Sequence, residues 1–251
     1  MSPDSLRKLI RFVLPPVFWL GAWQLAALAV GMEFKLPSPL SVVQALAGLS
    51  VQPLFWTSAA ATLGRILLGL AAGTLLGALL ACATSVSRWA SLLLAPAVKV
   101  IRATPVVSFI LLVWLWVARP HVPSVISALM VLPVVWGNVS KGIAQTDPQL
   151  LELASAYRFG RWKPLRLVYV PSVRPYFLSG VNTAMGLAWK SGVAAEAICL
   201  PKTALGTQIF YSKTYLNSPE LFAWTAVVIV LSFALEKFIA LLLRDRREAA
   251  V

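Results

Sequence analysis

The stretch Asp147–Pro175, DPQLLELASAYRFGRWKPLRLVYVPSVRP, is the only long polar interval in a chain that otherwise passes from one apolar segment to the next. It carries five basic residues against two acidic ones, so it must lie outside lipid. Asp147 can cap a helix whose first residue is Pro148. A second short amphipathic segment follows Gly160 and closes at Pro171. The stretch therefore predicts two short helices, joined by a turn, that project from the membrane-embedded part of the protein. Another protein can bind them there.

The composition of the whole chain indicates an integral membrane protein. Of its 251 residues, 59% are hydrophobic and 12% are charged. A soluble domain of this size could not bury so much apolar surface. Gly and Pro are scattered inside apolar runs of helical length, which favours helices over the alternating strands of a barrel. We therefore expect an all-α membrane protein.

The formal net charge of +13 would suit a nucleic-acid-binding protein, but the basic residues lie between hydrophobic spans rather than along one stripe. Of the 22 Lys and Arg, thirteen fall in the segments that connect the expected spans on one side of the membrane, or flank them there. Four fall on the other side, and five lie in or near the spans. By the positive-inside rule this asymmetry predicts about six transmembrane helices with both termini cytoplasmic, which places Asp147–Pro175 in the cytoplasm. We expect no nucleic-acid partner.

Read in order, residues 1–251 form one transmembrane domain. Residues 1–35 hold a first span that is longer than the core of a signal peptide and is therefore retained. Residues 36–53 form a helix on the outer surface, with Ser38 as its N-cap and Pro39 at its first position. Residues 54–251 form the core bundle, including a cytoplasmic loop at 141–175. In the second span Gly69, Gly73 and Gly77 leave one helix face bare, which favours close packing against a neighbouring helix.

Several polar residues inside the expected spans are candidates for a translocation pathway. Arg102 and Pro105 mark a break within the third apolar segment, where freed backbone groups need protein or water as partners. Arg102 could equally cap or snorkel from the broken helix, and Arg65 could snorkel or face a polar interior. Lys190 and Glu196, six residues apart, need not pair with each other. The candidates are Arg102, Pro105, Asn138, Lys190 and Glu196.

The Asp147–Pro175 stretch resembles the "EAA" loop of the permease subunits of binding-protein-dependent ATP-binding-cassette importers. The resemblance rests on Glu152-Leu153-Ala154 and on the apolar-basic stretch that ends at Val170-Pro171. Where the family has Gly, six residues after Glu152, this chain has Arg158 and offers Gly160 instead. Leu36-Pro37-Ser38-Pro39 and the segment from Ala195-Glu196 to Gly206 are similar to the nitrate-, sulfonate- and taurine-type permeases of this family.

This resemblance implies a type I importer bundle with a cytoplasmic coupling loop, in a bacterial plasma membrane. It implies as partners a dimer of ATPase subunits at the loop, an extracytoplasmic substrate-binding protein and a second permease copy, as in a homodimer. The solute would be small and possibly anionic, of the sulfonate, taurine, nitrate, bicarbonate or vitamin-precursor class. The implied coupling residues are Leu151, Glu152, Leu153, Ala154, Ala156, Tyr157, Arg158, Gly160 and Pro171.

The sequence contains no phosphate loop of the Gly-X4-Gly-Lys-Ser/Thr type and no catalytic or zinc-binding constellation. Its single His and two Cys residues give no metal-ligand cluster, and we expect no cofactor and no disulfide. We therefore expect a transporter subunit rather than an enzyme, with ATP hydrolysis on a separate chain. The alternative is an ATP-independent secondary transporter or channel, which would show inverted repeats with matching broken helices.

Overall fold

The computed structural model describes residues 3–160 and 162–248, and this part of the chain is helical, with no strand. The helices are α1 (Pro3–Val30), α2 (Pro39–Ser50), α3 (Pro53–Val86), α4 (Arg88–Ala103), α5 (Val106–Trp114), α6 (Val122–Ala144), α7 (Pro148–Ala156), α8 (Trp162–Pro164), the π-helical turn η1 (Leu165–Tyr169), α9 (Val170–Cys199), α10 (Leu205–Thr214) and α11 (Ser218–Glu248). The prediction of an all-α membrane protein is confirmed.

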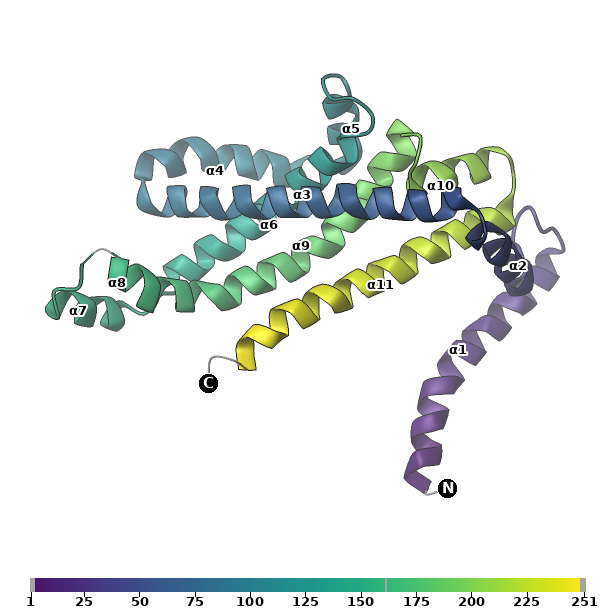
Figure 1. The fold of residues 1–251 in the computed structure, drawn as a ribbon, viewed down its shortest axis with the longest axis horizontal. Coiled ribbons are helices and arrows are strands. Elements are labelled where there is room, and N and C mark those ends of the chain that lie inside the picture. Colours follow the sequence, from purple (N-terminus) through teal and green to yellow (C-terminus); the bar gives the residue numbers. More distant parts are fainter. Residues whose placement is uncertain (1–2, 161, 249–251) are drawn as a thin grey trace.

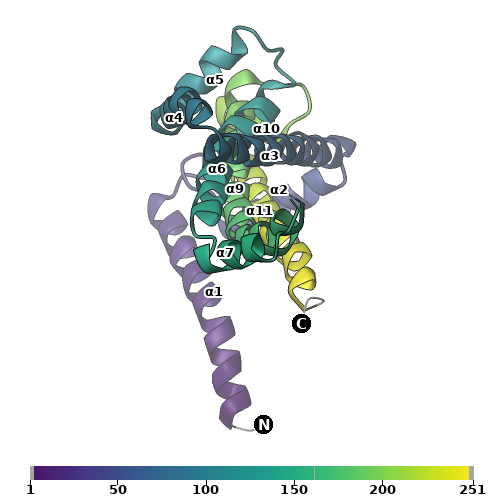
Figure 2. The ribbon, with the colours of Figure 1, turned by 90° about the vertical axis from the view of Figure 1, so that its left-hand side faces the viewer.

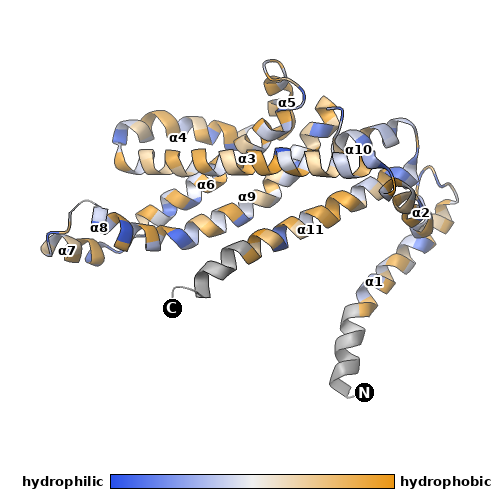
Figure 3. Cartoon of the chain, in the orientation of Figure 1, coloured by the Kyte–Doolittle hydropathy of each residue, from blue (hydrophilic) through white to orange (hydrophobic). Residues whose placement is uncertain are grey.

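Within the described residues, four helices are long and apolar enough to cross a membrane: α1, α3, α6 and α11. The pair α4 and α5 counts as a fifth span if its two parts are taken together. The sixth expected span corresponds to α9, which has 30 residues but is more polar, because it contains Asn182, Lys190 and Glu196. Figure 3 shows this contrast between the mixed colours of α9 and the largely orange α3 and α4.

Three of these helices form the centre of the bundle: α3 packs along α6, and α6 packs along α9. In both ribbon views α4 and α5 lie above α3, whereas α11 lies below it (Figures 1 and 2). Helix α1 leans away from the bundle and is joined to it at its C-terminal end. There the Trp23 indole N–H donates to the Pro37 carbonyl at 3.0 Å and the Trp23 ring stacks on Phe222.

The third apolar segment is bent more sharply than a kinked span, because α4 and α5 meet at 108°. The break falls at Thr104-Pro105, as the sequence predicted. Pro105 has no N–H to continue the helical ladder, and it drives the residue before it into an extended conformation. Thr104 accordingly has φ −79° and ψ 133°.

The prediction of a separate second helix that closes at Pro171 is wrong. Helix α8 passes through η1 directly into α9, so the chain is continuously helical from Trp162 to Cys199. Within η1 the helix is wound more widely, and the Val170 N–H bonds the Leu165 carbonyl five residues back. This register change accommodates Pro171, whose missing N–H would otherwise interrupt an α-helical ladder.

The glycines of α3 lie where this helix meets α6. A Cβ atom at Gly73 would lie 2.5 Å from the Ala128 carbonyl oxygen, and one at Gly77 would lie 2.8 Å from the Leu132 carbonyl oxygen. A Cβ at Gly69 would collide with the Ser124 carbonyl oxygen in the same way. The prediction that this glycine face serves close helix packing is confirmed.

We expect Gly73→Ala to lower the stability of the folded bundle by about 1–3 kcal/mol, because the added methyl group must push α3 away from α6. Gly64→Ala on the same helix is the matched control, since a Cβ there meets nothing within 4 Å. Unfolding in mixed detergent micelles measures the stability of both variants. Equal stability of the two would show that the close approach contributes nothing.

Candidate functional site

Helix α7 is formed by the residues that the sequence assigned to it. The Asp147 carboxylate accepts a hydrogen bond from the Gln149 N–H at 2.8 Å, and Pro148 occupies the first helical position. The predicted N-cap is therefore confirmed. Helix α7 and α8 lie together at one end of the molecule, whereas α2 and α10 lie at the opposite end (Figure 1).

The outer face of α7 combines one acidic side chain with exposed apolar ones. Glu152 is exposed, Leu153 is 54% exposed and Tyr157 is 70% exposed. Ala154, in contrast, is buried. Large apolar side chains exposed beside a charged one on a short helix at one end of the molecule are typical of a docking surface. The remaining implied coupling residues are Leu151, which is half-buried, and the exposed Ala156, Arg158, Gly160 and Pro171.

Arg158 itself makes the turn that follows α7. Its φ is +49°, in the left-handed region. The Phe159 N–H bonds the Ala154 carbonyl at 3.0 Å and the Arg158 N–H bonds the Ser155 carbonyl at 2.9 Å. This pair of bonds is a Schellman motif with Arg158 at C′, the position where glycine is favoured. Gly160 is not among the residues with positive φ, so it does not take over the role.

Because a side chain in the left-handed conformation costs about 1 kcal/mol, Arg158→Gly should stabilise the end of α7 by a similar amount. The change would appear as slower hydrogen exchange at the Arg158 and Phe159 amides. Gly160→Ala is the control: it adds a methyl group in open space at a residue without positive φ. Faster exchange in Arg158→Gly would mean that the arginine side chain, rather than the turn, holds the loop.

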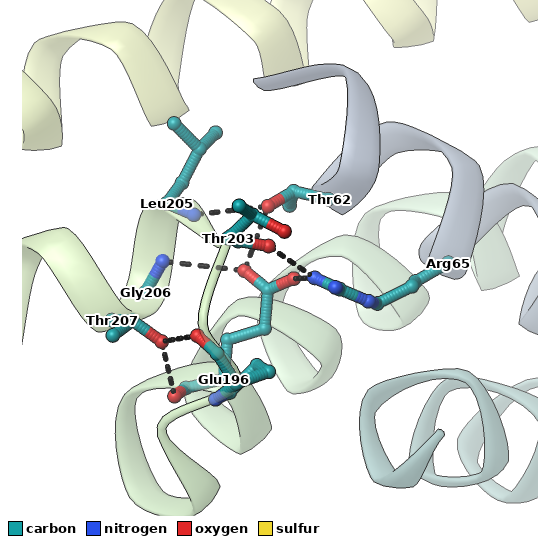
Figure 4. A network of polar contacts seen from close by, with 8 residues as sticks. Thr62, Arg65, Glu196, Thr203, Leu205, Gly206 and Thr207 are labelled. Carbon is teal, nitrogen blue, oxygen red and sulfur yellow. Dashed lines mark hydrogen bonds and ion pairs between the residues drawn. The ribbon is translucent and has the colours of Figure 1, made fainter. Parts of the chain in front are cut away.

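The opposite end of the bundle contains a buried polar network centred on Glu196 of α9 (Figure 4). One carboxylate oxygen of Glu196 accepts from the Arg65 guanidinium at 3.1 Å. The other accepts from the Thr62 hydroxyl at 2.8 Å and from the Gly206 N–H at 3.2 Å. Arg65 also donates to the Thr203 carbonyl at 2.7 Å. The carboxylate thereby joins α3, α9 and the start of α10.

Burial explains why both carboxylate oxygens of Glu196 have hydrogen-bond partners. The Glu196 side chain has no exposed surface and that of Arg65 is 17% exposed. A charge in such a place must be paired and hydrogen-bonded on its remaining oxygens. A Cβ at Gly206 would lie 2.7 Å from the Glu196 Cβ, so glycine is required for α10 to approach this closely. The sequence left open whether Arg65 snorkels or faces a polar interior, and the structure shows that it faces the polar interior formed by this network.

The expected pathway residues occupy different environments. Arg102, Pro105 and Lys190 are exposed, whereas Glu196 is enclosed in the network. Asn138 is half-buried, donates to the Val134 carbonyl at 2.9 Å and lies against Gly180 of α9. Among the described residues, no three of His, Cys, Asp and Glu lie together as metal ligands.

Sequence reasoning missed the partners of Glu196. Thr62 and Arg65 precede it by 134 and 131 residues, and no periodic pattern connects such positions. The available signal was the presence of two opposite charges, Arg65 and Glu196, within apolar segments, since intramembrane charges tend to pair. Glu236 of α11 is exposed in a span and was also not singled out.

We expect Glu196→Ala to destabilise the bundle by about 3–5 kcal/mol, because it leaves the Arg65 charge buried without its partner. Thermal unfolding of the detergent-solubilised protein measures the loss. The double variant Arg65→Met with Glu196→Gln should recover much of it. Lys190→Ala, which removes an exposed charge from the same helix, serves as the control. If Glu196→Ala were as stable as Lys190→Ala, the network would not hold the bundle together.

Comparison with known proteins relates this architecture to membrane transport. The family model described as "Binding-protein-dependent transport system inner membrane component" matches residues 73–248. An aliphatic sulfonates transport permease protein of Escherichia coli (strain K12) is 30% identical over 73% of this chain and 70% of its own length. The taurine transport system permease protein of the same organism is 24% identical over 85% of this chain and 80% of its own.

A third relative is named for a different kind of solute. The riboflavin transport system permease protein of Chloroflexus aurantiacus is 27% identical over 88% of this chain and 83% of its own length. Among solved structures, one titled "Crystal structure of an amino acid ABC transporter with histidines" matches with a TM-score of 0.65 at 21% identity. That match covers 80% of this chain and 97% of the other, and it supports the fold alone.

Proposed function

The chain belongs to the family of binding-protein-dependent transport system inner membrane components, the permeases of ATP-binding-cassette importers, and we propose that it moves a small solute into the cytoplasm using ATP hydrolysed by a partner subunit. As a multi-pass permease of the inner membrane it is not itself an enzyme. Membership of this family supports the proposal over the alternative of an ATP-independent secondary transporter or channel.

The observation that carries the proposal is the exposed face of α7. Glu152 stands beside Leu153 and Tyr157 on a segment that projects from one end of the helical bundle. This surface would receive the ATPase subunit, with the apolar side chains buried in the contact and the carboxylate fixing its register. The proposed topology places α7 and both termini in the cytoplasm, where ATP is available.

Movement would pass from α7, through the turn that follows it, into the continuous helix that begins at Trp162. Because α8, η1 and α9 run without a break from Trp162 to Cys199, a displacement of the loop would tilt α9 as one body. Closure of an ATPase dimer would draw together the α7 helices of two permease copies in a homodimer. The spans would then exchange between inward-open and outward-open arrangements, a population shift driven by the contacts of each state.

The solute class follows from the sulfonate- and taurine-type relatives as a proposal. Small anionic solutes such as sulfonates are the first to test, and a vitamin-like solute is the second, because of the riboflavin relative. An extracytoplasmic binding protein would select the solute and deliver it to the end of the bundle that bears α2 and α10.

Glu152→Lys should abolish stable association with the ATPase and reduce solute uptake at least about tenfold. The new ammonium group would face the groups of the ATPase subunit that pair with the Glu152 carboxylate, and such an opposition of like charges costs several kcal/mol. Affinity purification of the permease from membranes, followed by assay of bound ATPase activity, measures the association. Glu33→Lys makes the same charge change at an exposed position between α1 and α2 and should leave association unchanged. Full ATPase recovery with Glu152→Lys would remove the role assigned to α7.

A further inference from the structure

A second polar feature lies between α9 and α11, away from both the coupling loop and the Glu196 network. A cavity of about 560 Å³ is lined there by Asn182, Thr183 and Gly186 of α9. The α11 side of the cavity contributes Phe233, Glu236, Lys237 and Ala240. We call this cavity the α9–α11 groove.

The spacing of these residues shows that the groove is one continuous face on each helix. Asn182 and Gly186 are four residues apart, and Phe233, Glu236, Lys237 and Ala240 follow the i, i+3, i+4, i+7 spacing. Gly186 lies opposite the acidic side chain: a Cβ at this position would be 3.6 Å from the Glu236 carboxylate oxygen. The glycine therefore leaves the floor of the groove open beside the carboxylate.

The charges in the groove have no partners among the residues that the structure describes. Within the described residues, Arg65 pairs with Glu196, whereas neither Glu236 nor Lys237 forms a hydrogen bond or an ion pair. Both side chains are exposed although they belong to an apolar span. Such groups are too costly to face lipid, so they face water, a polar ligand or another protein surface.

The position of the groove along α9 and α11 indicates which side of the membrane it lies nearer to. Asn182 lies 17 residues from the end of α9 at Cys199, and Glu236 lies 18 residues from the start of α11 at Ser218. At 1.5 Å per residue, both are about 26 Å from the end of the bundle that carries α10. The hydrocarbon core is about 30 Å thick, so with α10 at the outer surface the groove lies near the inner boundary of the core.

We propose that the α9–α11 groove is a solute-binding subsite of the translocation pathway that accepts a small zwitterion. The Lys237 ammonium would pair with the anionic group of the solute, and the Glu236 carboxylate would accept hydrogen bonds from its amine. Asn182 and Thr183 supply further hydrogen bonds from α9. This inference rests on the proposed function, since it places the groove on the route of the solute.

Cysteine accessibility tests the groove without requiring transport. In permease complexes whose Cys82 and Cys199 are replaced by Ser, Asn182→Cys should react with water-soluble methanethiosulfonate reagents in inside-out vesicles. Leu75→Cys, on an exposed apolar face of α3, should not react. Gly186→Leu should fill the groove and protect Asn182→Cys, whereas Gly186→Ala should not. An unreactive Asn182→Cys, or one that forms a disulfide between two permease copies, would overturn the proposal.

The charge of the reagent then tests the two ionised side chains. Lys237→Gln should slow modification of Asn182→Cys by the sulfonate-bearing reagent about three- to tenfold, and Glu236→Gln should slow the trimethylammonium reagent similarly. Added taurine, an aminosulfonate zwitterion, should protect the cysteine better than ethanesulfonate at equal concentration. Equal protection by both, or by neither, would overturn the zwitterion assignment. ATPase recovery in the same membranes reports on the proposed function separately, so the two failures are distinguishable.

Discussion

A charged group inside a membrane must meet a partner or water rather than lipid, and this constraint accounts for the main polar features of the molecule. It predicts that the basic Asp147–Pro175 stretch, which forms α7 and the start of the long α8–η1–α9 helix, lies outside lipid. It also explains why Glu196, with no exposed surface, is held by Arg65, Thr62 and Gly206 together. The carboxylate is the centre of a joint between α3, α9 and α10, so the same group that needs partners also fixes the bundle.

The helices can meet at this joint because small residues let their backbones approach. Gly73 and Gly77 bring α3 against α6, and Gly206 brings the start of α10 against Glu196. Gly192 of α9 has the same role toward α3, since a Cβ there would lie 2.6 Å from Ile66. Closely packed helices with few gaps transmit displacement as rigid bodies. This packing is consistent with a permease in which movement of α7 at one end changes the arrangement of helices at the other.

The charged residues inside the spans therefore lie in two kinds of environment. Arg65 and Glu196 are paired within the chain and join its elements, whereas Glu236 and Lys237 face the α9–α11 groove without a partner from the described chain. The first arrangement favours one stable structure. The second leaves charge available to a visiting solute, which is what a transport route requires. The distinction depends on contacts rather than on residue type, because both sets combine one acid with one base.

The sequence by itself determined the features that depend on neighbouring residues: the helical class, the apolar spans, the caps at Ser38 and Asp147 and the break at Pro105. It predicted the helix of α7, but it treated Pro171 as a helix end, because the π-helical register of η1 is not visible in local residue preferences. It also left open how Arg158 would replace glycine, and the structure shows that arginine itself adopts the left-handed turn. Only the tertiary structure decided that Arg65 pairs with Glu196 and that Glu236 and Lys237 line a groove with α9. Those contacts join residues far apart in the chain, and helix packing, rather than sequence spacing, brings them together.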